Sequence, residues 1–127
     1  MNEGSCRRIL IVDDNLSLAE NLAEILERGG HEVCVASSAE DALFMAGRRG
    51  VDAVVADYRL DGTNGAALVK RLRETQCGLR AMVISACTDD KTVGEAEDAG
   101  AAFLSKPLDV ALLTGWIAAA VKAPPPR

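Results

Sequence analysis

The sequence predicts an α/β protein built on a doubly wound, five-stranded parallel sheet. Five short apolar runs alternate along the chain with five stretches in which apolar residues recur at helical spacing. The apolar runs show little polar alternation, as expected of strands that are buried on both faces of a parallel sheet. The 127 residues fit one domain of this kind. An eightfold α/β barrel needs about twice this length.

The first half of the chain supplies three predicted strands and two predicted helices. The strands cover residues 8–12, 31–36 and 51–57, and the helices cover 16–28 and 38–48. The pair Gly29-Gly30 ends the first helix, because glycine favours helix ends. Ser38 and Asp41 resemble a capping box, which predicts where the second helix begins.

The second half begins with a polar, glycine-containing loop over residues 58–65. The predicted strands that follow cover 79–85 and 101–107, and the predicted helices cover 66–75, 89–99 and 109–122. The helix over 89–99 is weakly determined, because it has an internal glycine and few large apolar residues. Right-handed crossovers between parallel strands make an open sheet with helices on both faces the natural topology.

The composition argues against several functional classes. A net charge of -5 and a pI of about 4.8 argue against nucleic-acid binding through a broad basic face. The chain has no apolar run of ~18 residues and no apolar segment near its start, so we expect neither a membrane span nor a signal peptide, and a cytoplasmic location. The four cysteines fit no metal or redox spacing and are expected to be free thiols: Cys6, Cys34, Cys77 and Cys87.

Polar residues stand where the predicted strands end. Asp13 and Asp14 follow the first strand, and Asp57 ends the third. Ser85 ends the fourth strand and Lys106 ends the fifth. Because ligands of open α/β sheets bind outside the carboxyl ends of the strands, we expect these five side chains to converge.

This set of side chains predicts phosphoryl chemistry at a magnesium site. Three neighbouring carboxylates repel one another unless a cation lies between them. Oxygen ligands without histidine or thiolate suit Mg²⁺. The ion alone leaves Lys106 and Ser85 without a role, whereas a phosphoryl group would take one oxygen to the metal, one to the ammonium and one to the hydroxyl.

The chain resembles the receiver domain of bacterial two-component response regulators over residues 7–122. The matching segments, in order, are ILIVDDN, VVADYRLDGTNG, MVISA and GAAFLSKP. The resemblance implies a flavodoxin-like (βα)5 fold with strand order 2-1-3-4-5. Residues 123–127 are then a proline-rich tail or the stub of a linker, and the nearness of Met1 to the first strand favours an N-terminal or free-standing receiver.

The resemblance assigns roles to the acidic residues. Asp57 would accept a phosphoryl group from a sensor histidine kinase or a phosphotransfer domain. Asp14, Asp57 and the backbone carbonyl of Arg59 would bind Mg²⁺ directly, and Asp13 would act through water. Asp61 stands where the family often has proline, which makes that loop more mobile and more acidic.

The resemblance also implies how the signal is transmitted. Lys106 would pair with a phosphoryl oxygen, and the Lys106–Pro107 peptide bond would be cis. Ser85 would be the switch hydroxyl and Phe103 the switch aromatic, although phenylalanine cannot make the hydrogen bond of a tyrosine. Arg59 and Cys87 would line the path of the hydrolytic water, and neither is suited to orient it, which predicts slow loss of the phosphoryl group.

The expected function is a phosphorylation-controlled switch that catalyses only its own phosphorylation and dephosphorylation. The face made by the fourth helix, fifth strand and fifth helix would contact an output domain or protein partner, and would suit a phosphorylation-dependent dimer. No direct contact with nucleic acid or membrane is expected of this domain. Within the class, the alternative is the receiver of a hybrid kinase or a phosphorelay intermediate.

An aspartate-nucleophile, magnesium-dependent phosphatase is the alternative from another class. That family places its nucleophile on the first strand, with a second aspartate two residues later. Here Asp57 ends the third strand and Arg59 stands at that offset, so this alternative is disfavoured. A dinucleotide-binding fold is also disfavoured, because the turn after the first strand reads DDNLSL and lacks a glycine-rich phosphate loop.

Overall fold

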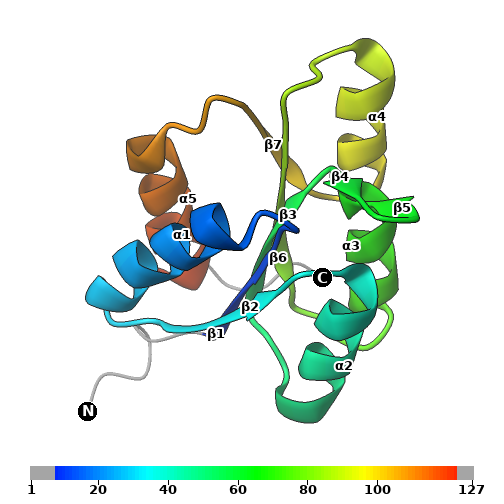
Figure 1. Ribbon diagram of the computed structural model, residues 1–127. Helices are drawn as coiled ribbons and strands as arrows, with labels where there is room; N and C mark the ends of the chain where they lie inside the picture. The colour runs from blue at the N-terminus through cyan, green and yellow to red at the C-terminus, as the bar shows by residue number, and fades with distance from the viewer. Residues whose placement is uncertain (1–7, 123–127) are drawn as a thin grey trace.

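The computed structural model describes residues 8–122, with side chains through residue 119, and contains a five-stranded parallel sheet (Figure 1). Its strands are β1 (Arg8–Val12), β2 (Glu32–Ala36), β3 (Ala53–Asp57), β6 (Arg80–Ser85) and β7 (Ala102–Ser105). They lie side by side in the order β2-β1-β3-β6-β7. Counting only these five strands along the chain, this order is 2-1-3-4-5, as predicted.

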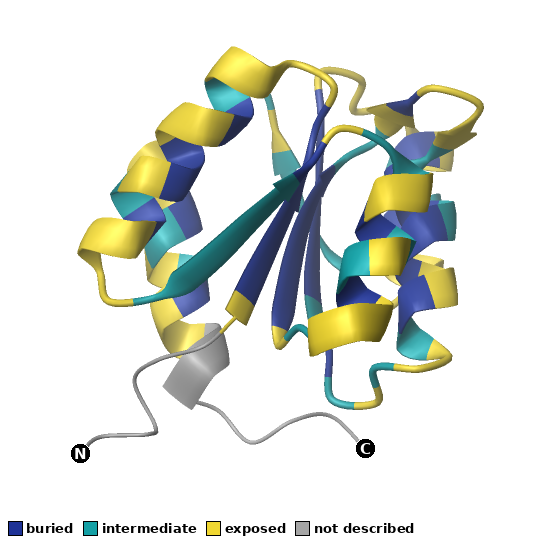
Figure 2. Cartoon of the chain, turned by 60° about the horizontal axis from the view of Figure 1, so that its bottom comes forward, coloured by how far each residue is buried: buried dark blue, intermediate teal, exposed yellow. Residues whose placement is uncertain are grey.

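The helices form a layer on each face of the sheet. They are α1 (Leu16–Arg28), α2 (Ala39–Arg49), α3 (Gly65–Arg73), α4 (Asp90–Asp98) and α5 (Val110–Lys122). Helices α1 and α5 cover one face, and α2, α3 and α4 cover the other (Figures 1 and 2). No helix within residues 8–122 is long and apolar enough to cross a bilayer. Residue 7 and the predicted tail over 123–127 lie outside the described residues.

Two apolar cores result from the alternation of side chains along the central strands. Leu10 and Val12 of β1 point into the core under α2, α3 and α4, whereas Ile9 and Ile11 point into the core under α1 and α5. All four are at most 1% exposed. Full burial of such a side chain contributes roughly 1.5–3 kcal/mol, which explains why β1 lies inside the sheet between β2 and β3.

Short polar side chains fix where the five helices begin. Each accepts a hydrogen bond from the backbone N–H three residues further on, which stabilises a helix by about 1 kcal/mol. These caps are Asn15, Ser38, Asn64, Asp89 and Asp109. The predicted capping box is half right: the Ser38 hydroxyl accepts from the Asp41 amide, but the Asp41 carboxylate bonds to Ser37.

The predicted loop over 58–65 contains structure that the sequence did not reveal. Strands β4 (Arg59–Leu60) and β5 (Thr63–Asn64) form a two-stranded antiparallel hairpin, which turns at Gly62 with a φ of +78°. Helix α3 then runs from residue 65 to 73, so the predicted range of 66–75 was one residue late at its start and two residues too long. The last strand is also shorter than predicted and ends two residues before Pro107.

Candidate functional site

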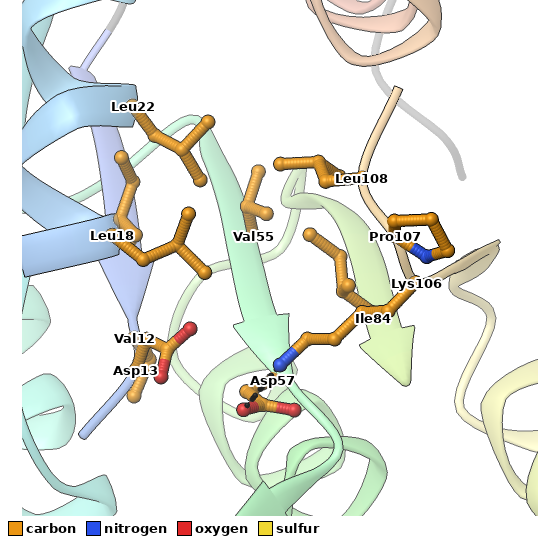
Figure 3. Close-up of a pocket in the computed structure, with 11 residues that line it drawn as sticks. Val12, Asp13, Leu18, Leu22, Val55, Asp57, Ile84, Lys106, Pro107 and Leu108 are labelled. Atoms are coloured by element: carbon orange, nitrogen blue, oxygen red, sulfur yellow. Dashed lines mark hydrogen bonds and ion pairs between the residues drawn. The ribbon is translucent and has the colours of Figure 1, made fainter. Parts of the chain in front are cut away.

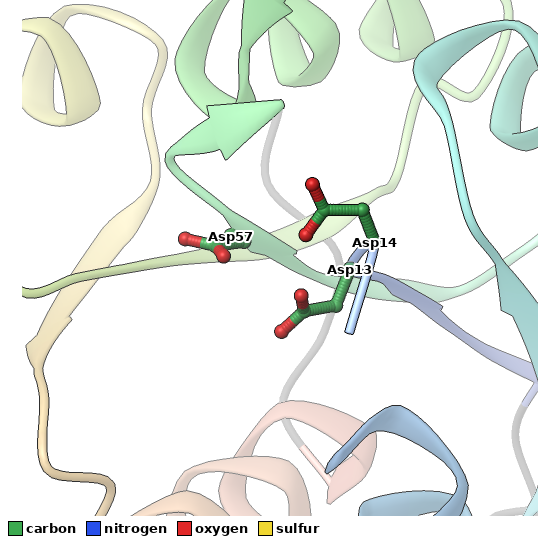
Figure 4. Close-up of side chains that lie close together, drawn as sticks. All are labelled: Asp13, Asp14 and Asp57. Atoms are coloured by element: carbon green, nitrogen blue, oxygen red, sulfur yellow. The ribbon is translucent and has the colours of Figure 1, made fainter. Parts of the chain in front are cut away.

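Three carboxylates meet at the carboxyl ends of β1 and β3 (Figure 4). Asp13 and Asp14 directly follow β1, and Asp57 is the last residue of β3. One oxygen of each lies within 4.8 Å of an oxygen of the other two. Parallel strands β1 and β3 are neighbours in the sheet, so their ends bring together residues more than forty positions apart.

The surroundings of Asp13 favour a cation. This residue is only 6% exposed, and its Oδ1 accepts a hydrogen bond of 2.9 Å from the Asn15 amide. Burial raises the pKa of Asp13, and the charges of Asp57 and Asp14 raise it further, against the lowering effects of the Asn15 amide and Lys106. A divalent cation would offset this crowding of negative charge. The donors are all carboxylate oxygens, which fit Mg²⁺.

Removing the charge of Asp13 should stabilise the metal-free protein at neutral pH. A carboxyl group whose pKa is raised by folding stabilises the fold below its unfolded pKa and loses that contribution as pH rises through the folded value. We therefore expect Asp13→Asn to raise Tm by a few degrees at pH 7 in EDTA, and the gain to vanish near pH 4. Thermal unfolding followed by circular dichroism measures both; an equal gain at the two pH values would contradict the explanation.

Lys106 contacts the carboxylate that ends β3. Its Nζ lies 3.1 Å from Oδ2 of Asp57, and the two side chains are 31% and 10% exposed (Figure 3). The following peptide bond, Lys106–Pro107, is cis. The Lys106 amide continues the sheet by donating to the Ser85 carbonyl at 2.9 Å. The end of β7 thus presents an ammonium to the group of carboxylates.

Gly65 allows the chain to pack closely behind Asp57. A Cβ atom at this position would lie 2.5 Å from the Asp57 carbonyl oxygen, a distance that real side chains do not adopt. The Gly65 amide donates to the Tyr58 carbonyl at 2.8 Å, which closes the loop that follows β3. The beginning of α3 is therefore fixed against the backbone of Asp57.

Ser85 and Phe103 lie on the strands at the other side of Asp57. Ser85 is buried, and its hydroxyl accepts a hydrogen bond of 2.9 Å from the Cys87 amide. Phe103 pairs with Val83 in the register of β6 and β7. It is half-buried and packs against the core under α2, α3 and α4. The Ser85 hydroxyl thus lies at the edge of the site and already has a hydrogen-bond partner, the Cys87 amide.

Arg59 and Cys87 flank the site and are both exposed. The Arg59 amide lies 3.3 Å from Asp57 Oδ1, so its backbone reaches the carboxylate. The Arg59 side chain forms no ion pair with a described residue. The hydroxyl of Thr92 on α4 donates a weak hydrogen bond to the Cys87 sulfur at 3.7 Å. Their suggested influence on water stays a prediction.

One hydrogen bond beside the site could not be predicted from the sequence. The Tyr58 hydroxyl donates a hydrogen bond to Glu95 of α4, 37 residues away. This bond raises the pKa of Tyr58 and lowers that of Glu95. The residue after Asp57 is thereby tied to α4. Only the tertiary fold brings these two side chains together.

An apolar hollow adjoins the carboxylates on the side of α1 (Figure 3). Its volume is about 190 Å³, and Asp13, Asp57 and Lys106 form its polar end. Apolar side chains of α1, the central strands and the segment after β7 form the rest: Leu18, Leu22, Val55, Ile84, Pro107 and Leu108. The site is therefore open toward α1 and the beginning of α5.

Comparisons with known proteins agree on one family. Residues 9–118 match the response regulator receiver domain. A response regulator receiver protein from Anaeromyxobacter sp. (strain Fw109-5) is 46% identical over 105 residues, which cover 82% of this chain and 44% of that protein. The sensory/regulatory protein RpfC from Xanthomonas campestris pv. campestris is 35% identical over 116 residues, which cover 87% of this chain and 16% of RpfC.

Solved structures agree in fold. A CheY-like receiver domain from Methanospirillum hungatei JF-1 superposes with a TM-score of 0.86 at 25% identity, covering 92% of this chain and 94% of that chain. A response regulator from Burkholderia pseudomallei, solved with a phosphorylated aspartic acid, calcium ion and citrate, has a TM-score of 0.80 at 30% identity, covering 86% of this chain and 65% of that chain.

The chain spans less than half the length of the two curated relatives named above. The matched part nevertheless covers most of this chain and includes every strand of the sheet except the first residue of β1. Motif order, fold and sequence identity all lead to the same assignment. This chain belongs to the response regulator receiver domain family of two-component systems.

Proposed function

We propose that this receiver accepts a phosphoryl group on Asp57, from a sensor histidine kinase or a phosphotransfer domain. The observation that carries the proposal is the contact of Lys106 Nζ with Asp57 Oδ2, at 3.1 Å, beside a group of three carboxylates. An ammonium that contacts one of several clustered carboxylates suits a phosphoryl site. After transfer it can contact a phosphoryl oxygen and neutralise part of the negative charge of the phosphoryl group. The Burkholderia pseudomallei structure, with its phosphorylated aspartic acid, supports the assignment.

Mg²⁺ would be held directly by Asp14, Asp57 and the Arg59 carbonyl, and by Asp13 through water. When bound, the ion would offset the negative charge of the carboxylates and of the phosphoryl oxygens. An oxygen of Asp57 attacks phosphorus, an O–P bond forms, and the bond from phosphorus to the donor's leaving atom breaks. Lys106 neutralises charge on the transferred group. The low exposure of the Asp57 side chain limits the access of competing water.

The switch would begin at Ser85. Its hydroxyl would leave the Cys87 amide and donate to a phosphoryl oxygen, and Phe103 would turn into the space that Ser85 vacates. Tyr58 links the residue beside the acceptor to Glu95 of α4, so movement of this loop would also reach α4. The face made by α4, β7 and α5 would then bind an output domain or partner protein, or a second phosphorylated copy.

The proposed reactions are confined to the protein's own phosphorylation and dephosphorylation in the cytoplasm, with no external substrate.

A receiver within a hybrid kinase or a phosphorelay intermediate is the second candidate. It is favoured by the similarity to RpfC, of which the matched region covers only 16%. The phosphatase alternative remains disfavoured, since the proposed nucleophile ends β3 and not the first strand.

Labelling with acetyl phosphate tests the proposal. We expect intact-mass spectrometry to show one added phosphate in the presence of Mg²⁺ and none in EDTA. Asp57→Asn should abolish the added mass. Asp61→Asn, which alters an exposed aspartate of the neighbouring hairpin turn, is the matched control and should label normally. Full labelling of Asp57→Asn would refute the assignment.

We expect slow hydrolysis of the phosphoryl group on Asp57, and faster hydrolysis when Arg59 and Cys87 are replaced. Hydrolysis needs a group that orients the attacking water, and an exposed guanidinium or thiol does this poorly. The double variant Arg59→Asn, Cys87→Glu supplies a carboxamide and a carboxylate, and should shorten the lifetime about tenfold or more. The rate of mass loss after removal of acetyl phosphate measures it. Equal lifetimes in the two proteins would show that these positions do not control the water.

Beryllofluoride with Mg²⁺ should change amide exchange mainly over residues 88–105. The reason is that α4 is short, carries an internal glycine, and is tied to the acceptor loop through the bond between Tyr58 and Glu95. Exchange mass spectrometry measures the change, and Tyr58→Phe should raise exchange of α4 even without the ligand. Changes confined to residues 16–48 would contradict the proposed route.

A further inference from the structure

A second hollow lies at the end of the sheet opposite to Asp57. Its volume is about 370 Å³, within the range of small-molecule sites. It opens beside Arg80, the first residue of β6, whereas the proposed phosphoryl site lies beyond Ser85, the last residue of that strand. Its other walls come from the end of α3, the segment between α4 and β7, and Trp116 of α5.

Two guanidinium groups face this hollow without a carboxylate partner. Neither Arg73 nor Arg80 forms an ion pair with a described residue. Asp98 also lines the hollow, but it is exposed and lies beyond ion-pair distance of both. Burial and then the charge of Arg80 lower the pKa of Arg73, so the two cations repel each other.

The two arginines are placed differently. Arg73 is held in position, since its Nε donates to the Ala99 carbonyl at 3.1 Å and its Nη2 donates to the Gly100 carbonyl at 2.8 Å. Its Nη1 makes no hydrogen bond to a described residue, and is left for a ligand. The Nε of Arg80 is shielded from solvent and has no hydrogen-bond partner among the described residues. The Nη1 and Nη2 atoms of Arg80 make no hydrogen bond to a described residue either, so these donors are left for an acceptor in the hollow.

We propose that this hollow binds a small oxyanion, a phosphate or a carboxylate group, between Arg73 and Arg80. Arginine binds both groups through paired N–H donors, and a negative charge here removes the repulsion between the two guanidinium groups. The half-buried ring of Trp116 supplies an apolar wall for the rest of such a compound. Because the Arg73 side chain is already held in position, binding of the anion costs little side-chain entropy at this residue.

The single tryptophan of the chain reports on this site directly. The experiment is a fluorescence titration of Trp116 with sodium phosphate, and in a second arm with succinate, against chloride at constant ionic strength. EDTA is present so that divalent ions do not fill the acidic site. We expect a saturable change with at least one of the two anions, and a rise in Tm at saturation.

Variants locate the bound anion. Arg80→Gln should weaken binding about tenfold or more, whereas Lys106→Met, at the other end of the sheet, should leave the affinity unchanged. Asp98→Asn should tighten binding about two- to threefold, because it removes an opposing charge. If Arg80→Gln does not fold, the Asp98→Asn result decides. No saturable change with either anion, an unchanged affinity in Arg80→Gln or Asp98→Asn, or loss of binding in Lys106→Met would overturn the proposal.

Discussion

Replacing Lys106 with methionine is expected to slow labelling of Asp57 by acetyl phosphate about a hundredfold. The Lys106 ammonium is the cation that contacts Asp57, and methionine keeps most of its apolar stem while removing the charge. Removal of one preorganised electrostatic partner typically costs a factor of about 10²–10³ in rate. The initial rate of mass gain in saturating Mg²⁺ measures the effect.

Lys70→Met provides the matched control for this variant. Lys70 is an exposed lysine in the last turn of α3, and it forms no ion pair with a described residue. Its replacement changes the net charge by the same amount, so it separates a local effect from a general one. Equal rates in the native protein and Lys106→Met would mean that the ammonium plays no part in the transfer.

Asp14→Ala is expected to weaken Mg²⁺ binding about tenfold or more, and Asp13→Ala by less. Asp14 is exposed, and no described residue donates a hydrogen bond to its side chain, so both oxygens are available to the ion. One oxygen of Asp13 already accepts from the Asn15 amide. Burial also raises the pKa of Asp13, which makes its charged form costly to keep.

Titration calorimetry of the two variants measures this order, with Asp61→Ala as a control for the loss of one nearby negative charge. The structure supports a ranking that the residue types alone do not provide, since both positions are aspartates that adjoin in the chain. A larger loss in Asp13→Ala would mean that the roles of the two aspartates are exchanged.

The sheet was predictable because its signals are local. The run from Ile9 to Val12 is apolar at every position, and burial on both faces needs that pattern. Gly29 and Ser38 mark helix ends through backbone chemistry that depends on few neighbours. The convergence of Asp13 with Asp57 was predictable for another reason: parallel topology places the ends of neighbouring strands at one edge.

Other features depend on tertiary contacts that residue patterns do not encode. The bond between Tyr58 and Glu95 joins a strand end to a helix 37 residues later. The hairpin at Arg59–Leu60 is two residues long on each side, too short for any periodicity to appear. Arg73 and Arg80 line the same hollow, because α3 ends beside it and β6 begins beside it. None of these three features follows from the order of residues along the chain.

Chemical trapping identifies which residue carries the phosphoryl group, which we propose to be Asp57. Borohydride reduces an aspartyl phosphate to the corresponding alcohol, with release of phosphate, so the modified residue keeps a stable mark through digestion. After labelling with acetyl phosphate and Mg²⁺, we predict homoserine at position 57 in the peptide spectrum. Homoserine at position 13 or 14, with position 57 unmodified in fully labelled protein, would show that Asp57 is not the phosphoryl acceptor.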